Sequence, residues 1–213
     1  MSRGSRLSWQ RCSTKWSDRL DRYGLLLAPG ASASSNQAAL VAVDRAATRA
    51  GLAVRRMDFP YALAGRRAPD RPPVLLAAVV KEAASLAAGP DLATDRTFLG
   101  GRSMGGRMCS MAVAEGLPAA GLVLISYPLH PPGRPDKMRT EHFGLLDLPC
   151  LFVSGTRDSF GSPAELEAAV ALIPGPVTAY YIERGDHGLR GRDAEVATLV
   201  AEWLRAQISA RSP

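Results

Sequence analysis

The sequence predicts an α/β protein, with a mostly parallel sheet of about six strands and helices on both faces. Two observations lead to this fold class. Short apolar runs alternate with longer segments of helical periodicity along most of the chain, and turn residues separate them. The runs are apolar throughout, as in strands that are covered on both sides. Such an alternation is typical of a parallel sheet between two layers of helices.

Each element has its own signal in the sequence. Apolar and β-branched runs bounded by turn residues predict strands at residues 23–28, 52–59, 96–100, 121–126, 150–154 and 177–182. Segments of helical spacing predict helices at residues 36–50, 74–88, 104–115, 163–172 and 193–208. Gly51, Gly89 and Gly116 directly follow the first three helices, where a glycine commonly ends a helix.

Length and composition limit the class of protein. With 213 residues the chain fits one domain, which we place at residues 23–213. A hydrophobic content of 46% excludes a disordered protein, and no 18-residue apolar run indicates a membrane-spanning helix. No secretory signal is predicted, since no apolar segment follows the basic N-terminus. Cys12, Cys109 and Cys150 are odd in number and lack metal-ligand spacing, which favours a reduced, cytoplasmic setting.

The positive charge of the chain is concentrated at its N-terminal end. The formal net charge is +6, and residues 1–23 contain six Lys or Arg against two Asp. The remainder is close to neutral and shows no motif that interleaves aromatic residues with arginines for nucleic acid. We interpret residues 1–22 as a solvated basic leader and predict neither nucleic acid nor membrane as a partner. The oligomeric state is left open by the sequence.

A G-x-S-x-G motif, Gly101-Arg102-Ser103-Met104-Gly105, is the most informative feature of the chain. It lies directly after a predicted strand and directly before a predicted helix, which is the position of a nucleophile elbow. The sharp turn of an elbow needs neighbours without bulk, and the two glycines provide them. The turn exposes the serine hydroxyl and directs the next amide at the carbonyl under attack.

Two other interpretations of this segment compete with the elbow. Gly101 to Met108 spells G-x-x-x-x-G-R-M, which is close to a phosphate-binding P-loop. However, Arg107 and Met108 stand where that loop has Lys and then Ser or Thr. The simpler alternative is a glycine-rich turn with a buried serine, and it weakens once partners for the serine are found.

A base and an acid follow two later strands. Among the three histidines, His187 lies in a turn after the strand at residues 177–182, and Asp158 lies in a turn after the strand at residues 150–154. Catalytic groups of a parallel sheet collect at the carboxyl ends of the strands. The chain order Ser, Asp, His is also the order expected for α/β-hydrolases. Ser103, Asp158 and His187 therefore form a candidate catalytic triad.

Each member of this triad has an ordinary explanation when it is taken alone. Asp158 is of a type that forms turns, and His187 is typical of a solvated loop. Asp186 is a competing carboxylate, but neighbouring loop side chains usually diverge, so we interpret it as a turn residue. Three strand-end positions in the required order favour the triad over coincidence. His130 and His142 lack metal-ligand partners at defined spacing, so surface or structural roles are expected.

Two irregular stretches remain between the predicted elements. Residues 60–73 are rich in Arg and Pro and are expected to form a basic connection on the surface. Residues 127–149 are expected to lie over the site, although they are too few for a large helical lid. Several arginines flank the motif segments and suit an acidic substrate, but we expect them to be solvated surface residues, namely Arg102, Arg107, Arg157, Arg184 and Arg190.

Together these features resemble the α/β-hydrolase superfamily over most of the chain from Tyr23 onward. Residues 100–107, 127–133 and 155–158 are similar to a branch of small bacterial hydrolases. That branch is related to dienelactone-hydrolase-like proteins and to a subunit of a histone-acetyltransferase complex in animals. The opening strands of the superfamily are not recognisable in residues 1–22, so we expect an α/β-hydrolase fold with six strands instead of eight and no large cap domain.

The resemblance implies Ser103 as nucleophile, Asp158 as acid and His187 as base, with oxyanion-binding amides at Met104 and near Ala31. We predict acyl transfer from a small ester to water through an acyl-serine intermediate, without a metal or other cofactor. An ester is favoured over an amide because a small site with little cover offers few contacts to drive expulsion of an amine. The alternative is a catalytically silent interaction module that retains the fold.

Overall fold

The computed structural model describes residues 23–89 and 92–211, so the predicted leader at residues 1–22 lies outside the described residues. The chain forms a six-stranded sheet in which neighbouring strands are parallel and the order is β2-β1-β3-β4-β5-β6. The strands are β1 (Gly24–Ala28), β2 (Ala53–Arg56), β3 (Thr97–Arg102), β4 (Gly121–Ile125), β5 (Cys150–Gly155) and β6 (Val177–Ile182). The predicted parallel sheet of about six strands is confirmed.

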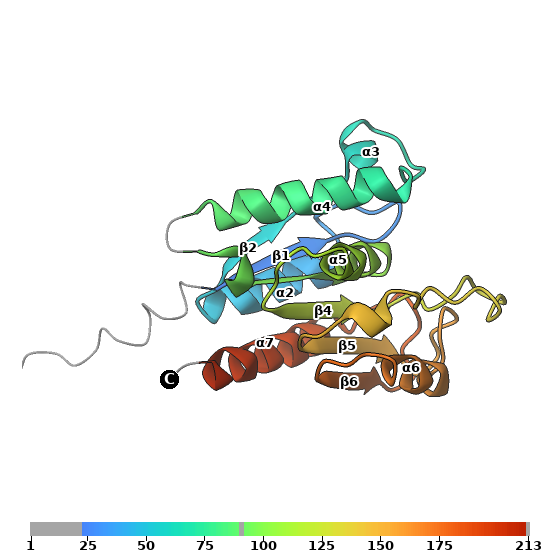
Figure 1. Ribbon diagram of the computed structural model, residues 1–213. Helices are drawn as coiled ribbons and strands as arrows, with labels where there is room; N and C mark the ends of the chain where they lie inside the picture. Colours follow the sequence, from blue (N-terminus) through green and yellow to red (C-terminus); the bar gives the residue numbers. More distant parts are fainter. Residues whose placement is uncertain (1–22, 90–91, 212–213) are drawn as a thin grey trace, which may run out of the picture.

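Helices cover both faces of this sheet (Figure 1). They are α2 (Ala38–Arg49), α3 (Pro60–Leu63), α4 (Pro72–Ala87), α5 (Met104–Ala114), α6 (Pro163–Val170) and α7 (Asp193–Ala210), with short 3-10 helices η1 (Thr94–Arg96) and η2 (Phe143–Leu145). Helices α2 and α7 pack together on one face, and α4, α5 and α6 cover the other. Among the described helices, none has both the length and the apolar character needed to span a bilayer.

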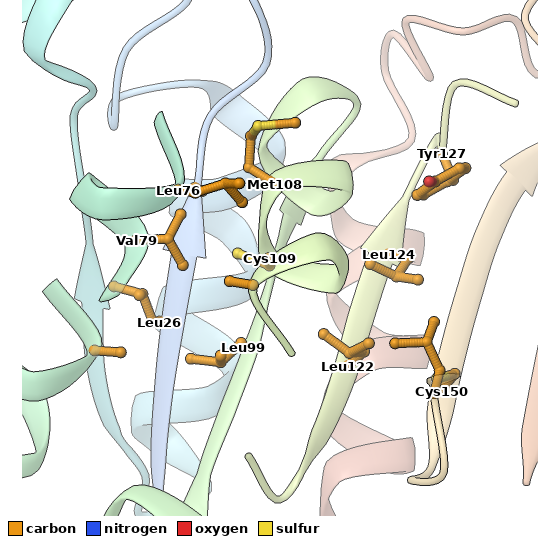
Figure 2. Close-up of a cluster of buried hydrophobic side chains, with 14 of the residues drawn as sticks. Leu26, Leu76, Val79, Leu99, Met108, Cys109, Leu122, Leu124, Tyr127 and Cys150 are labelled. Carbon is orange, nitrogen blue, oxygen red and sulfur yellow. The ribbon is translucent and has the colours of Figure 1, made fainter. Parts of the chain in front are cut away.

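The layering produces two apolar cores. Successive side chains of a strand point to opposite faces, so Leu26 of β1 joins the core beneath α4 and α5, while Leu25 and Leu27 join the core beneath α2 and α7. Figure 2 shows part of the first core, where Val79 of α4 and Met108 of α5 meet the strands. The four central strands are buried along nearly their whole length, which explains their continuous apolar sequences.

The order of the strands creates a crevice at one position of the sheet. From β1 the chain goes to β2 on one side, and later returns past β1 to form β3 on the other. Ala28 and Gly101, close to the carboxyl ends of β1 and β3, are partners in the parallel register. In open α/β sheets, ligands bind where the connections from two such neighbouring strands diverge. This rule favours the space between residues 29–31 and Ser103 as a candidate binding site.

One predicted connection differs from the expectation. Residues 60–73 were expected to be irregular and on the surface, but they begin with α3, and Tyr61 of this helix is fully buried. The hydroxyl of Tyr61 accepts a hydrogen bond from the N–H of Ser32 at 3.2 Å. The surface interpretation is wrong for this part because a single helical turn is too short to show periodicity in the sequence.

Candidate active site

Ser103 occupies a sharp turn between β3 and α5. Its φ of 51° and ψ of −119° lie outside the regions that non-glycine residues favour. Its N–H donates a hydrogen bond to the carbonyl of Ile125 at 2.8 Å, which ties the turn to β4. A Cβ atom on Gly101 or Gly105 would collide with the carbonyl oxygen of Ala28. The two glycines of the motif are therefore required for the close approach of strand β1 to the end of β3 and to the start of helix α5.

Asp158 and His187 lie in neighbouring turns after β5 and β6. The two turns are joined directly, because the N–H of Arg157 donates to the carbonyl of Gly185 at 2.8 Å. The N–H of Arg184 also donates to the Thr156 hydroxyl at 2.8 Å. A carboxylate and an imidazole from different strands are thus held side by side by hydrogen bonds of their own backbones.

The structure brings the three predicted side chains into one line of hydrogen bonds. Nε2 of His187 lies 2.9 Å from Oγ of Ser103, and Nδ1 lies 2.9 and 2.8 Å from the two carboxylate oxygens of Asp158. An ionised carboxylate only accepts hydrogen bonds, so we assign the imidazole proton to Nδ1. Nε2 then presents its lone pair to the serine O–H, as a general base requires.

Three further contacts hold the side chains of Asp158 and His187 in position. Asp158 is 6% exposed and accepts a second hydrogen bond from the N–H of Phe160 at 2.8 Å. The Phe160 ring stacks on the His187 ring, with centroids 4.0 Å apart. Arg102 donates to the carbonyl oxygen of His187 at 2.5 Å, and burial lowers the pKa of its guanidinium while Asp158 opposes that shift. Phe160 was not predicted from the sequence, because a lone aromatic in a turn carries no periodic signal.

The competing carboxylate of the sequence analysis has a different environment. Asp186 is exposed, and its carbonyl oxygen accepts a hydrogen bond from the N–H of Leu189 at 3.1 Å. The imidazole of His187 bonds to Asp158 instead. These contacts agree with the interpretation of Asp186 as a turn residue.

The two residues that were predicted to supply oxyanion amides, Ala31 and Met104, line the same cavity as Ser103. The amides on either side of Ala31 are engaged, since Gly30 donates to the side chain of Gln37 and Ser32 donates to Tyr61, whereas the Ala31 amide has no hydrogen-bond acceptor within residues 23–89 and 92–211. Met104 is the first residue of α5, where helix amides lack intrahelical partners. Both amides are thus available to an oxyanion.

The cavity beside Ser103 has a volume of about 460 Å³, which suits a small molecule. Its wall includes residues of both irregular stretches, Pro69 and Asp70 from the first and Pro128 and Arg139 from the second. The expectation that residues 127–149 lie over the site agrees with this position. Residues 60–73 also contribute, which the sequence analysis did not anticipate.

Two of the flanking arginines were expected on the surface but line the cavity. Arg102 and Arg107 are both half-buried there. The expectation of solvated surface residues is therefore wrong for these two, because the segments that cover them are distant in sequence. Arg157, Arg184 and Arg190 are exposed, as expected.

The other two histidines have structural contacts. His130 is 5% exposed, its Nδ1 lies 2.8 Å from the carbonyl oxygen of Pro131, and its Nε2 lies 3.4 Å from Glu165. Nε2 of His142 lies 2.8 Å from the hydroxyl of Ser110. Within the described residues, no group of three or more His, Cys, Asp or Glu side chains is arranged to hold a metal ion.

A parallel sheet with a serine at a strand-to-helix turn, and an acid and a histidine after later strands, defines the architecture of an α/β-hydrolase. The comparison with protein families agrees. Residues 21–211 match the family described as an alpha/beta hydrolase domain, and the chain belongs to this family. The prediction of the superfamily and of its fold is confirmed.

Solved structures of similar fold include several hydrolases. Est1E from Butyrivibrio proteoclasticus is 16% identical with a TM-score of 0.71, covering 89% of this chain and 90% of its own. DcsB in complex with its substrate analogue is 16% identical with a TM-score of 0.69, covering 89% and 92%. A dienelactone hydrolase from Anabaena variabilis is 23% identical with a TM-score of 0.68, covering 86% of each chain. At these identities the similarity establishes the fold.

Proposed function

We propose that this protein is a serine hydrolase that cleaves a small carboxylic ester by acyl transfer to water. The observation that carries the proposal is the line of hydrogen bonds from Asp158 through His187 to Ser103, which ends in a cavity of small-molecule size. Membership of the alpha/beta hydrolase domain family supports hydrolysis as the reaction class. A structure of Est1E with bound ferulic acid, 18% identical over 89% of this chain, supports a small organic substrate.

The proposed mechanism uses only side chains and amides of this chain. Nε2 of His187 takes the proton of the Ser103 hydroxyl as Oγ attacks the ester carbonyl. The oxyanion accepts hydrogen bonds from the N–H groups of Met104 and Ala31. Asp158 stabilises the imidazolium, which then protonates the leaving alkoxide. In the second half, Nε2 of His187 takes a proton from water as the water attacks the acyl-serine. The imidazolium then returns the proton to Oγ of Ser103 as the carboxylic acid leaves.

The predicted setting and partners belong to the same proposal. We infer a cytoplasmic protein acting on a small-molecule ester, with neither nucleic acid nor membrane as partner. Cys109 and Cys150 are both free and buried, and burial raises the pKa of each thiol to about 12. Thiols of this kind are inert at neutral pH, so a structural role in packing explains them.

Covalent labelling tests the nucleophile directly. A fluorophosphonate is expected to modify the wild-type protein once and to leave Ser103→Ala unmodified. Ser110→Ala is the matched control, because Ser110 also lies within hydrogen-bond distance of a histidine but is completely buried. It is expected to be labelled like the wild type. A folded wild-type protein that resists labelling would support the catalytically silent interaction module instead.

The pH dependence of ester cleavage tests the base. A general base must be unprotonated to act, so we expect the rate of ester cleavage to rise with pH through a single ionisation. A rate that does not change with pH would contradict the assignment of His187.

A further inference from the structure

Two guanidinium groups without an acidic partner line the cavity beside Ser103. Arg107 lies on α5, one turn after Ser103, and Arg139 lies in the segment between β4 and β5. Both side chains are half-buried, and Nε of Arg107 is fully buried without a hydrogen-bond partner. Within the part of the chain that the structure describes, neither guanidinium forms an ion pair or hydrogen bond.

These two positive charges act on each other. Burial lowers the pKa of Arg139, and the charge of Arg107 lowers it further. The exposed carboxylate of Glu141 opposes this shift more weakly and lies outside ion-pair distance. Two like charges that are partly removed from water without a counter-ion are an unfavourable arrangement. An anionic ligand between them relieves it.

The remaining charges of the cavity wall are already compensated. The negative charges of Asp158, Asp186 and Asp193 act on Arg102, whose guanidinium also donates to the carbonyl of His187. Asp70 forms an ion pair with Arg66 at 2.7 Å through Oδ1. The second oxygen of Asp70 is buried without a partner and is able to accept a hydrogen bond from a ligand. Most of the other lining side chains are apolar, among them Leu75 and Met108. The uncompensated charge of the cavity is therefore positive and belongs to the arginine pair.

We propose that Arg107 and Arg139 form an anion subsite, and that the natural substrate is an ester carrying a carboxylate. This inference rests on the proposed function and specifies the substrate class. Guanidinium groups bind carboxylates through paired, charge-assisted hydrogen bonds. Apolar wall residues suit a short carbon chain that joins the ester to the carboxylate. The carboxylate belongs either to the acyl part or to the alcohol part, and paired substrates distinguish the two.

Two pairs of esters test the subsite, and within each pair a methyl group replaces the carboxylate. In the first, mono(para-nitrophenyl) glutarate carries a carboxylate on the acyl part, and para-nitrophenyl pentanoate is its neutral counterpart. In the second, para-(carboxymethyl)phenyl pentanoate carries it on the alcohol part, and para-ethylphenyl pentanoate is neutral. For one pair we expect kcat/KM of the wild type to favour the anionic ester at least about tenfold.

Substitution of the arginines is expected to remove this preference. The ratio of kcat/KM for the anionic ester to that for the neutral ester should fall about tenfold in Arg107→Gln and in Arg139→Gln. Arg134→Gln is the matched control, because Arg134 lies in the same segment but is exposed and paired with Asp136 at 3.0 Å. It should keep the wild-type ratio. Equal rates within both pairs, or an unchanged ratio in the double variant Arg107→Gln/Arg139→Gln, would overturn the subsite.

Two measurements separate failure of the subsite from failure of the proposed function. A wild-type protein that is labelled by fluorophosphonate and cleaves neutral esters without preferring anionic ones is a serine hydrolase that lacks the subsite. If no ester is cleaved, calorimetric titration with glutarate shows whether the anion subsite exists. Binding to the wild type that weakens at least about tenfold in Arg107→Gln supports the subsite. Absent binding, or equal binding to both proteins, contradicts it. Circular dichroism of each variant verifies folding.

Discussion

One serine–histidine pair lies at the start of helix α5 and a second lies further along the same helix, and their surroundings differ. Ser103 precedes the helix and lies 2.9 Å from Nε2 of His187, while Ser110 lies two turns further on and 2.8 Å from Nε2 of His142. The distance between serine oxygen and histidine nitrogen is almost the same in both. A short contact between these two residue types therefore does not by itself make a nucleophile.

The direction of the hydrogen bond separates the two pairs. Ser110 donates its hydroxyl proton to the carbonyl oxygen of Arg107 at 2.9 Å, so its oxygen is left to accept from the imidazole. We therefore assign a proton to Nε2 of His142. In the first pair, Asp158 holds the imidazole proton on the opposite nitrogen and Ser103 is the donor. The carboxylate thus decides which partner is able to remove a proton.

Access and charge separate the pairs as well. Ser110 is completely buried, while Ser103 lines the cavity. Burial, and then the charge of Arg107, lowers the pKa of His142 to about 4, so this imidazole stays neutral at neutral pH and resists protonation. A general base with so low a pKa binds the abstracted proton too weakly to be an effective catalyst. The first pair has the features of a reaction site, and the second pair fastens the segment after β4 to α5.

The largest effect we expect comes from removing each serine in turn. Hydrolysis of para-nitrophenyl pentanoate should fall on the order of 10⁵-fold in kcat for Ser103→Ala, because the attacking oxygen is lost. Ser110→Ala removes only a buried structural hydroxyl, and kcat should change less than about threefold. Steady-state kinetics on both purified variants measures this. Similar losses of kcat in the two variants would contradict the conclusion that only Ser103 acts as the nucleophile.

The next largest effect tests the carboxylate that distinguishes the first pair. Asp158→Asn should lower kcat about 10⁴-fold, since an amide no longer fixes the proton on Nδ1 of His187. Asp186→Asn changes the adjacent, exposed carboxylate and should lower kcat less than about threefold. Rates of both variants at one pH are sufficient to compare them. A larger loss in Asp186→Asn would show that the acid has been assigned to the wrong residue.

The sheet, and the ends of its strands, could be predicted from the sequence because their signals are local. The apolar runs of β3, β5 and β6 end in recognisable turns, and the parallel topology brings those ends to one edge of the sheet. This is why Ser103, Asp158 and His187 could be singled out in the sequence and are found together in the structure.

The wall of the cavity could not be predicted, because it depends on contacts between segments that are distant in sequence. Arg139 and Phe160 lie in irregular segments, and no periodicity indicates which way such side chains point. The sequence predicted that Arg107 lies on the helix after Ser103, but it did not indicate which distant segments cover this side chain. The second pair was also invisible, since Ser110 and His142 are 32 positions apart.

A smaller effect tests the ring that packs against His187. Phe160→Ala removes the stacked aromatic face, so the imidazole loses part of its orientation, and kcat should fall about tenfold. Phe160→Tyr keeps the face and should retain most of the rate. Separate values of kcat and KM distinguish orientation of the base from loss of substrate contact. A change confined to KM would mean that the ring serves the cavity wall alone.

The smallest effect concerns the stability that the second pair provides. The pKa of His142 is about 4 in the folded protein against 6.5 as its ordinary value. Between these pH values His142 binds a proton in the unfolded chain but not in the folded chain. Its contribution to the free energy of unfolding is therefore fully present above about pH 6.5 and is lost as the pH falls toward 4. Allowing for partial exposure, the loss is about 1–2 kcal/mol.

His142→Gln keeps a polar side chain at this position but removes its titration. Urea unfolding at about pH 7 and about pH 4.5 should therefore show the free energy of unfolding falling by about 1–2 kcal/mol less in this variant than in the wild type. Every other titrating group is shared by the two proteins, so the difference isolates His142. Equal losses would mean that its imidazole accepts a proton in the folded protein as readily as in water, and the contrast with His187 would then rest on access and the carboxylate alone.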